Sequence, residues 1–168
     1  MKELNIFDIA FDSLSIGEHH FQFEIGKEVF EFFDHDDFLE VGVNGSLTLI
    51  KASSYINMSF TANGTIEVDC DRCGEQLVFP VECKQEIILK FSSKGIDSKS
   101  DEIIYLGANE NQINVARFYY EMIVLWLPLK KIHEESECNP DVVDFLNQWS
   151  EKEEEETDPR WDALKKLK

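Results

Sequence analysis

Three cysteines and one histidine in this sequence have the types and spacing of a metal site. Cys70 and Cys73 are separated by two residues, and two thiolates at this spacing can bind one tetrahedral Zn²⁺. A structural zinc site needs four ligands, and His133 and Cys138 lie five residues apart between two predicted helices. Joining the two pairs costs roughly 3–4 kcal/mol of chain entropy, whereas a structural zinc ion contributes about 10–16 kcal/mol. The sequence therefore predicts a zinc site made of Cys70, Cys73, His133 and Cys138.

Other chemistry at these cysteines agrees less well with the sequence. A thioredoxin-like dithiol needs a cysteine at a helix N-terminus, but one predicted strand enters Cys70 and another follows Cys73. A catalytic zinc ion, with Glu134 or Glu135 as its base, would need an open coordination position that four protein ligands do not leave. The sequence has no glycine-rich phosphate loop, nucleophile elbow or His-Glu-x-x-His motif. Two reduced thiols near an unrelated histidine remain the alternative to zinc.

We predict no metal-binding or catalytic role for the fourth cysteine or for the other three histidines. Cys83 shares one face of a predicted strand with apolar residues, so we expect it to lie in the core as a small hydrophobic side chain. His19 and His20 lie in a polar stretch, and His35 lies among aspartates. All three histidines are predicted to be solvated.

Composition and charge limit the classes of function. The chain has 168 residues, of which 43% are hydrophobic, enough for one domain with a core. Its 34 acidic and 16 basic residues give a net charge of −18, which opposes long-range attraction to RNA or anionic lipid. The longest apolar run, 122–129, is too short to span a membrane. Because residues 1–8 lack the apolar region of a secretory signal, we expect a cytoplasmic protein.

Alternating apolar and polar residues predict the strands that position the first cysteine pair. The clearest alternation covers 58–68, and a second covers 77–91, where Pro80 indicates a sheet edge or a bulge. Cys70 and Cys73 therefore lie at the tip of a hairpin, where Gly74 can adopt positive φ. Weaker strand signals occur at 6–11, 21–25, 41–50 and 103–106, and a short helix or turn is expected at 27–39.

Helical periodicity predicts the elements around the second ligand pair. A helix begins after Asn114, which can cap it, and ends at Pro128. Asn139-Pro140 has the cap and first-turn proline of another helix. The predicted fold is α+β, a mainly antiparallel sheet or partly closed barrel with C-terminal helices.

The C-terminal end differs from the preceding chain in composition. We assign residues 1–150 to a single domain, 151–157 to an acidic linker and 158–168 to a short helix. This helix has Trp161, Leu164 and Leu167 on its apolar side. Of the three segments 1–133, 134–158 and 159–168, only the last has a net positive charge. We expect it to dock on a partner. The alternative is that it folds back on its own domain or attracts the acidic linker.

Three motifs follow one another in the C-terminal part of the chain. They are GTIEVDCDRC at 64–73, LWLPL at 125–129 and DPRWDALKKL at 158–167. In this order and separation they make the chain resemble the large ribosomal RNA subunit accumulation protein YceD family. Many relatives have a cysteine at the position of His133, and histidine can replace it as a ligand.

The resemblance implies a protein without enzymatic activity that supports maturation or accumulation of large-subunit ribosomal RNA by binding an assembling particle. The partner would be the ribosomal RNA, a ribosomal protein or both. Two sets of residues are candidates for the contact: Arg72, Lys130 and Lys131, which would converge at the zinc site, and Arg160, Trp161, Leu164 and Leu167. Alternatively, Arg72, Lys130 and Lys131 are only solvated. The alternative functions are an acidic adaptor or chaperone for a basic ribosomal protein and, third, a metal-dependent hydrolase.

Overall fold

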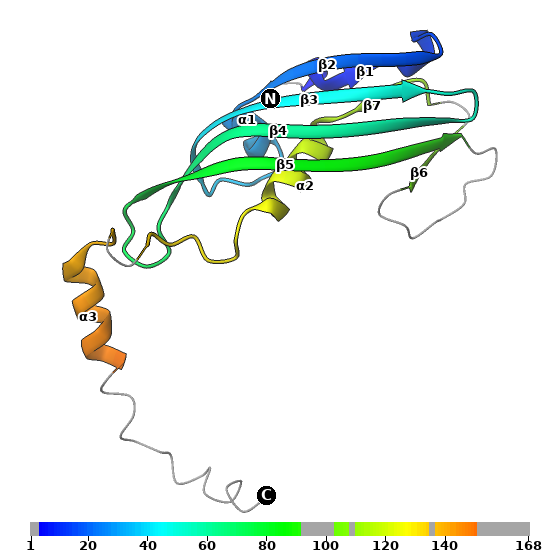
Figure 1. Cartoon of the computed structure of the whole chain (residues 1–168). Coiled ribbons are helices and arrows are strands. Elements are labelled where there is room, and N and C mark those ends of the chain that lie inside the picture. The colour runs from blue at the N-terminus through cyan, green and yellow to red at the C-terminus, as the bar shows by residue number, and fades with distance from the viewer. Residues whose placement is uncertain (1–3, 92–102, 108–109, 135–136, 151–168) are drawn as a thin grey trace, which may run out of the picture.

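The computed structural model describes residues 4–91, 103–107, 110–134 and 137–150. A long twisted sheet is covered on one side by a helix, and a further helix stands at one end (Figure 1). The strands are β1 (Asp8–Ile9), β2 (Gly17–Ile25), β3 (Phe38–Lys51), β4 (Tyr55–Asp69), β5 (Gln76–Phe91), β6 (Ile103–Leu106) and β7 (Ile113–Asn114). The helices are α1 (Lys27–Phe32), α2 (Ala116–Trp126) and α3 (Pro140–Ser150), with short 3₁₀ turns at Asn5–Phe7 and Phe11–Ser13. The predicted α+β class is confirmed.

The main sheet has five strands in the order β2-β3-β4-β5-β6. Strands β2 to β5 pair antiparallel, and only β6 is parallel, to the last four residues of β5. The alternative of a partly closed barrel is wrong, because β2 and β6 form opposite edges that do not pair in the described part of the chain. The sheet buries its apolar face against α2, so it does not need to close on itself.

The core lies between the inner face of the sheet and α2. Along β4 the predicted alternation is present, with a buried row that packs toward the helix: Ile56, Met58, Phe60, Ala62, Ile66 and Val68. The ring centroid of Phe60 lies 5.3 Å from that of Tyr119 and 5.5 Å from that of Phe118. These aromatic contacts fix α2 over the centre of the sheet.

Most predicted strands are present, and β2 to β5 are each longer than predicted. The signals at 58–68 and 77–91 lie inside β4 and β5, and 103–106 is β6. Pro80 lies where β5 has no second neighbour among the described strands, so its missing N–H leaves no gap between paired strands. The segments 21–25 and 41–50 extend into β2 and β3.

The predicted strand at 6–11 is wrong apart from the two residues of β1. Phe7, Ile9 and Phe11 are all buried, as one face of a strand would be, so the apolar pattern alone could not exclude a strand. The backbone instead forms two 3₁₀ turns, at Asn5–Phe7 and Phe11–Ser13. The Lys51 ammonium group stabilises the second turn by donating to the carbonyl oxygens of Phe11 and Leu14, each at 2.8 Å.

The predicted helix caps are confirmed. Asn114 Oδ1 accepts a hydrogen bond from the N–H of Ala116 at 3.0 Å, and Asn139 Oδ1 accepts one from the N–H of Asp141 at 3.1 Å. Leu127, which precedes Pro128, is extended and ends α2. None of the helices in the described ranges combines the length and apolar character that crossing a bilayer requires.

The short helix expected within 27–39 is α1, but the segment ends differently from the prediction. Strand β3 already begins at Phe38. His35, predicted to be solvated, is partly buried, and its ring centroid lies 4.6 Å from that of Phe38 and 5.9 Å from that of Tyr120. Because aspartates surround His35 in the sequence, the local pattern did not indicate its contacts with Phe38 and Tyr120. His20 is exposed, as predicted.

We predict that Gly64→Ala destabilises the sheet. A Cβ at Gly64 would overlap the carbonyl oxygen of Gly42 and lie 2.7 Å from Cα of Val43, so β3 and β4 would have to separate. The expected loss in the free energy of unfolding is about 1–3 kcal/mol, measured by urea denaturation. Gly42→Ala is the matched control, because a Cβ there meets nothing within 4 Å. Equal losses for both variants would contradict the close approach.

Candidate metal centre

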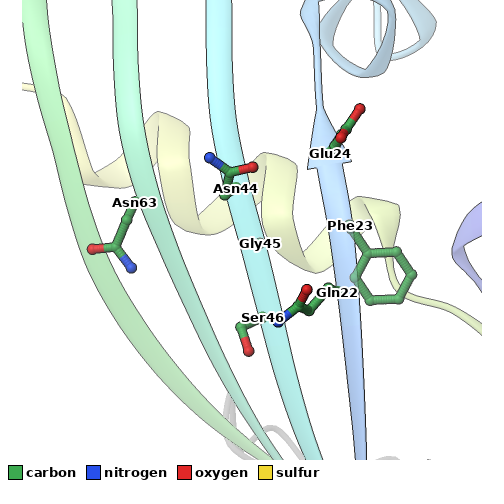
Figure 2. Close-up of a pocket in the computed structure, with 7 residues that line it drawn as sticks. All are labelled: Gln22, Phe23, Glu24, Asn44, Gly45, Ser46 and Asn63. Atoms are coloured by element: carbon green, nitrogen blue, oxygen red, sulfur yellow. The ribbon is translucent and has the colours of Figure 1, made fainter.

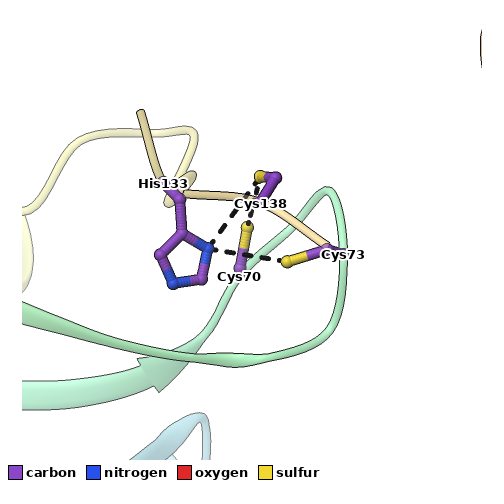
Figure 3. Close-up of side chains that lie close together, drawn as sticks. All are labelled: Cys70, Cys73, His133 and Cys138. Carbon is purple, nitrogen blue, oxygen red and sulfur yellow. Dashed lines mark hydrogen bonds between the residues drawn. The ribbon is translucent and has the colours of Figure 1, made fainter. Parts of the chain in front are cut away.

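The predicted ligands come from two segments that are far apart in the sequence. Cys70 and Cys73 lie in the turn between β4 and β5, and His133 and Cys138 lie between α2 and α3 (Figure 3). The turn is tight: the N–H of Cys70 donates to the Glu75 carbonyl at 2.8 Å, and the N–H of Gly74 donates to the Cys70 carbonyl at 2.9 Å. Gly74 has φ +73°, as its predicted role requires.

The four side chains converge on one point. Their ligand atoms all lie within 4.8 Å of one another. Cys70 Sγ is 3.9 Å from Cys138 Sγ, and His133 Nδ1 is 3.5 Å from Cys73 Sγ and 3.9 Å from Cys138 Sγ. Around a tetrahedral zinc ion, sulfur atoms are separated by about 3.8 Å, and sulfur and nitrogen by about 3.5 Å. The spacing therefore fits a metal ion with four protein ligands.

The histidine is oriented by a contact outside the cluster. His133 Nε2 lies 3.0 Å from the carbonyl oxygen of Gln76, which can only accept, so Nε2 carries the proton and donates. Nδ1 is then the unprotonated nitrogen, and it faces the thiols (Figure 3). A ligand histidine in a metalloprotein has this arrangement, in which the second ring nitrogen is held by an acceptor.

The backbone around the turn favours thiolates. Burial raises the pKa of the Cys70 thiol, but three backbone N–H groups directed at its sulfur outweigh burial and lower the pKa to about 6. These N–H groups belong to Cys73, His133 and Arg72. The backbone N–H of Asn139 has the largest effect on Cys73 and lowers its pKa as well. A thiolate is the form that binds a metal, so the turn is preorganised for this role.

The two ligand-bearing segments are also joined by hydrogen bonds that need no metal. The N–H of Asp71 donates to the carbonyl of Lys131 at 2.7 Å, and the N–H of Lys131 donates to Asp71 Oδ2 at 2.6 Å. On the other side, Asn139 Nδ2 donates to Glu75 Oε1 at 2.8 Å. Asp71 and Asn139 therefore bring the second ligand pair to the first.

These joining contacts were missed by the sequence reasoning. Asp71 lies between the two cysteines, but nothing in the sequence pairs it with a backbone amide 60 residues away. Asn139 was identified as a helix cap, and its amide nitrogen has the second role of binding Glu75. Asn139 is next to the predicted ligand Cys138, and its amide has both a donor and an acceptor. This combination is the feature of the sequence that could have indicated a second hydrogen bond.

The cluster is partly buried. Cys70 is 3% exposed and Cys138 is 6% exposed, whereas Cys73 and His133 are partly exposed. Four protein side chains are the number that fills a tetrahedral structural metal site. Cys83 faces the core as predicted, and burial raises its pKa. It takes no part in the cluster.

The three basic residues predicted near the centre differ in their exposure and in their neighbours. The two hydrogen bonds between Asp71 and Lys131 place the segments that carry Arg72 and Lys131 next to each other. Arg72 is partly buried and lines a hollow of about 460 Å³ together with Val143, Leu146 and Asn147 of α3, whereas Lys130 is exposed. The other predicted contact residues, Arg160, Trp161, Leu164 and Leu167, lie outside the described residues, as do the linker 151–157 and the helix 158–168.

A second hollow, of about 400 Å³, lies on the outer face of the sheet. Figure 2 shows that amide and hydroxyl side chains from β2, β3 and β4 line it, including Gln22, Asn44, Ser46 and Asn63. Glu24 is its one titratable lining residue. The hollow has neither a nucleophile with a base nor a set of metal ligands, so the chemistry of the described chain is concentrated at the Cys70–Cys138 cluster.

Comparison with protein families gives one assignment. The model described as large ribosomal RNA subunit accumulation protein YceD matches residues 58–168, which begin in β4 and include all four clustered ligands, α2 and α3. Comparison with curated proteins and with solved structures gave no match. The matched segment covers well over half of the chain and contains the three motifs on which the predicted resemblance rests. The protein belongs to the YceD family of large ribosomal RNA subunit accumulation proteins.

Proposed function

We propose that this protein supports the maturation or accumulation of large-subunit ribosomal RNA by binding an assembling ribosomal particle in the cytoplasm. The observation that carries the proposal is the family match over residues 58–168. The cluster supports a binding role rather than a catalytic one, because its four side chains would occupy all the positions of a tetrahedral ion.

The metal we propose is zinc, with a structural role. Three thiolates and one imidazole are ligands that suit Zn²⁺, and their separations match tetrahedral coordination. Bound zinc would hold Cys70 and Cys73 against His133 and Cys138, and it would thereby hold the turn against the start of α3. Cys70, Cys73, His133 and Cys138 would be its ligands.

The proposed RNA contact is a small basic spot formed by Arg72, Lys130 and Lys131. A chain with a net charge of −18 cannot coat RNA, so its contact with phosphates must be local. Three phosphate contacts would give only a shallow salt dependence, with a log–log slope of about −2 to −3. Arg160, Trp161, Leu164 and Leu167 would add a contact with a ribosomal protein.

A second candidate function is an acidic adaptor for a basic ribosomal protein. The excess of 34 acidic over 16 basic residues and the run Glu153–Glu156 favour it. It would bind such a protein without RNA and lose binding when that run is neutralised. A metal-dependent hydrolase ranks third, because it would need an open metal position.

We predict that the protein purifies with about one zinc ion per chain and that His133→Ala abolishes this zinc. His133→Cys should retain it, because a thiolate can replace the imidazole at the fourth position. Metal content is measured by elemental analysis of protein prepared without added metal. A chelator should lower the melting temperature by about 10 °C.

Cys83→Ala is the control for metal content. It removes a potential zinc ligand from outside the cluster and should leave zinc unchanged. Less than about half an equivalent of zinc in the wild-type protein would overturn the zinc assignment.

We predict that the tagged protein sediments from a lysate with particles that contain precursor large-subunit RNA. Replacing Arg72, Lys130 and Lys131 by Ala should move it toward the top of the sucrose gradient, because the basic spot is lost. The control replaces three cations away from the centre, Lys84, Lys90 and Arg117, by Ala, and it should sediment like wild type. Exposed ion pairs such as Lys84–Glu86 contribute little to stability, so the control should fold.

Two outcomes would contradict parts of this proposal. If both triple variants sediment like wild type, the basic spot is not the contact. If the wild-type protein stays at the top of the gradient at low salt and after crosslinking, stable particle binding is wrong, and the adaptor becomes the better proposal.

A further inference from the structure

Helix α3 carries an apolar stripe whose two aromatic side chains are exposed in the described structure. Val142, Phe145, Leu146 and Trp149 follow the i, i+3, i+4, i+7 spacing that places side chains on one face of a helix. Phe145 is 57% exposed and Trp149 is 60% exposed, and their ring centroids are 5.9 Å apart. In Figure 1 α3 stands beyond the end of the sheet. Two large aromatic side chains in contact with solvent on one helix indicate a surface that another segment covers.

The charges around this stripe identify the chemistry of that segment. Asp141 and Asp144 are exposed on α3, and Glu137 precedes it, whereas residues 137–150 contain no lysine or arginine. Arg72, from the turn between β4 and β5, is the one cation that lines the hollow beside Leu146. A segment that covers the stripe should therefore combine apolar side chains with positive charge.

The C-terminal segment of the chain has this chemistry. Residues 159–168 hold four basic residues and one acidic residue, a net charge of +3. Trp161 and Leu164 have the i, i+3 spacing of one helix face, and Pro159 suits the first position of a helix. A helix of this length is marginal in water by itself, so it needs a surface to pack on.

The connection between the two helices allows them to meet. The seven residues 151–157 can span up to about 25 Å, and the 11 residues of α3 are about 16 Å long. The chain can therefore turn back along the full length of α3. A short tether also raises the effective concentration of the segment to about the millimolar range, which favours it over a separate molecule.

We propose that residues 158–168 fold back as a helix antiparallel to α3 and cover Phe145 and Trp149 in the free protein. Trp161 and Leu164 pack on the apolar stripe, and Lys165 and Lys168 lie beside Asp141 and Asp144. The proposal does not rest on the ribosomal function. If both proposals hold, the particle and α3 compete for residues 158–168. Trp161 then leaves α3 only when the protein binds the particle.

The test is hydrogen–deuterium exchange of the full-length, metal-loaded protein, followed by mass spectrometry of peptides from 140–150. The double variant Trp161→Ala, Leu164→Ala should exchange these amides about tenfold faster than wild type, because the cover is lost. Lys166→Ala is the matched control, since Lys166 lies on the opposite side of a helix from Trp161 and should leave exchange unchanged. Peptides from β4 report on the fold and should be the same in all variants.

A reciprocal variant makes the test independent of one substitution. Phe145→Ala, Trp149→Ala removes the stripe and should speed exchange in peptides from 158–168. If protection of 140–150 rises with protein concentration and a dimer sediments, the occupant is a second copy and the intramolecular proposal is wrong. If neither double variant changes exchange at any concentration, residues 158–168 do not cover α3, and the proposal is also wrong.

Discussion

The turn between β4 and β5 is held against the segment after α2 by two hydrogen bonds between Asp71 and Lys131, one between their backbones and one from the Lys131 N–H to the Asp71 carboxylate. The four proposed metal ligands meet where these segments touch. This junction depends on the sheet. Strands β4 and β5 pair along their whole length, so they carry the turn to a fixed place at the end of the sheet. Packing of Tyr119 and Phe118 on Phe60 fixes α2, from which the second segment leaves.

The junction also determines where α3 begins. Cys138 is a proposed ligand, Asn139 bonds Glu75 and caps the helix, and Pro140 is its first residue. Three successive residues therefore connect the cluster to α3 without a flexible spacer. The exposed aromatic side chains of α3 and the basic segment around Arg72 lie at the same end of the molecule as the cluster. The opposite end, where β6 joins β5, carries none of the described residues that are proposed for function.

Structural features that depend on neighbouring residues were predicted correctly from the sequence. The alternation along β4, the Asn114 and Asn139 caps and the Gly74 turn all follow from neighbouring residues, and all are confirmed. The four side chains of the cluster were predicted because thiolates and imidazoles are the usual zinc ligands, and the sequence has only four cysteines and four histidines. The strand at 6–11 and the solvated His35 were wrong because tertiary contacts outweighed the local pattern. The bond from Asp71 to Lys131 and the open sheet depend on pairing between distant residues, which spacing in one sequence does not encode.

The order of the ligands along the chain has a consequence for synthesis. Cys70 and Cys73 leave a ribosome first, and His133 follows 60 residues after Cys73. At about 5–20 residues per second, the first pair waits roughly 3–12 s for its partners. During this interval two thiols lie at a hairpin tip without the other half of their site, open to oxidation or to a softer metal. Binding of the proposed zinc ion would therefore depend on whether the second ligand pair is synthesised before these side reactions occur. The hydrogen bonds between Asp71 and Lys131 favour closure of the site as soon as Lys131 emerges.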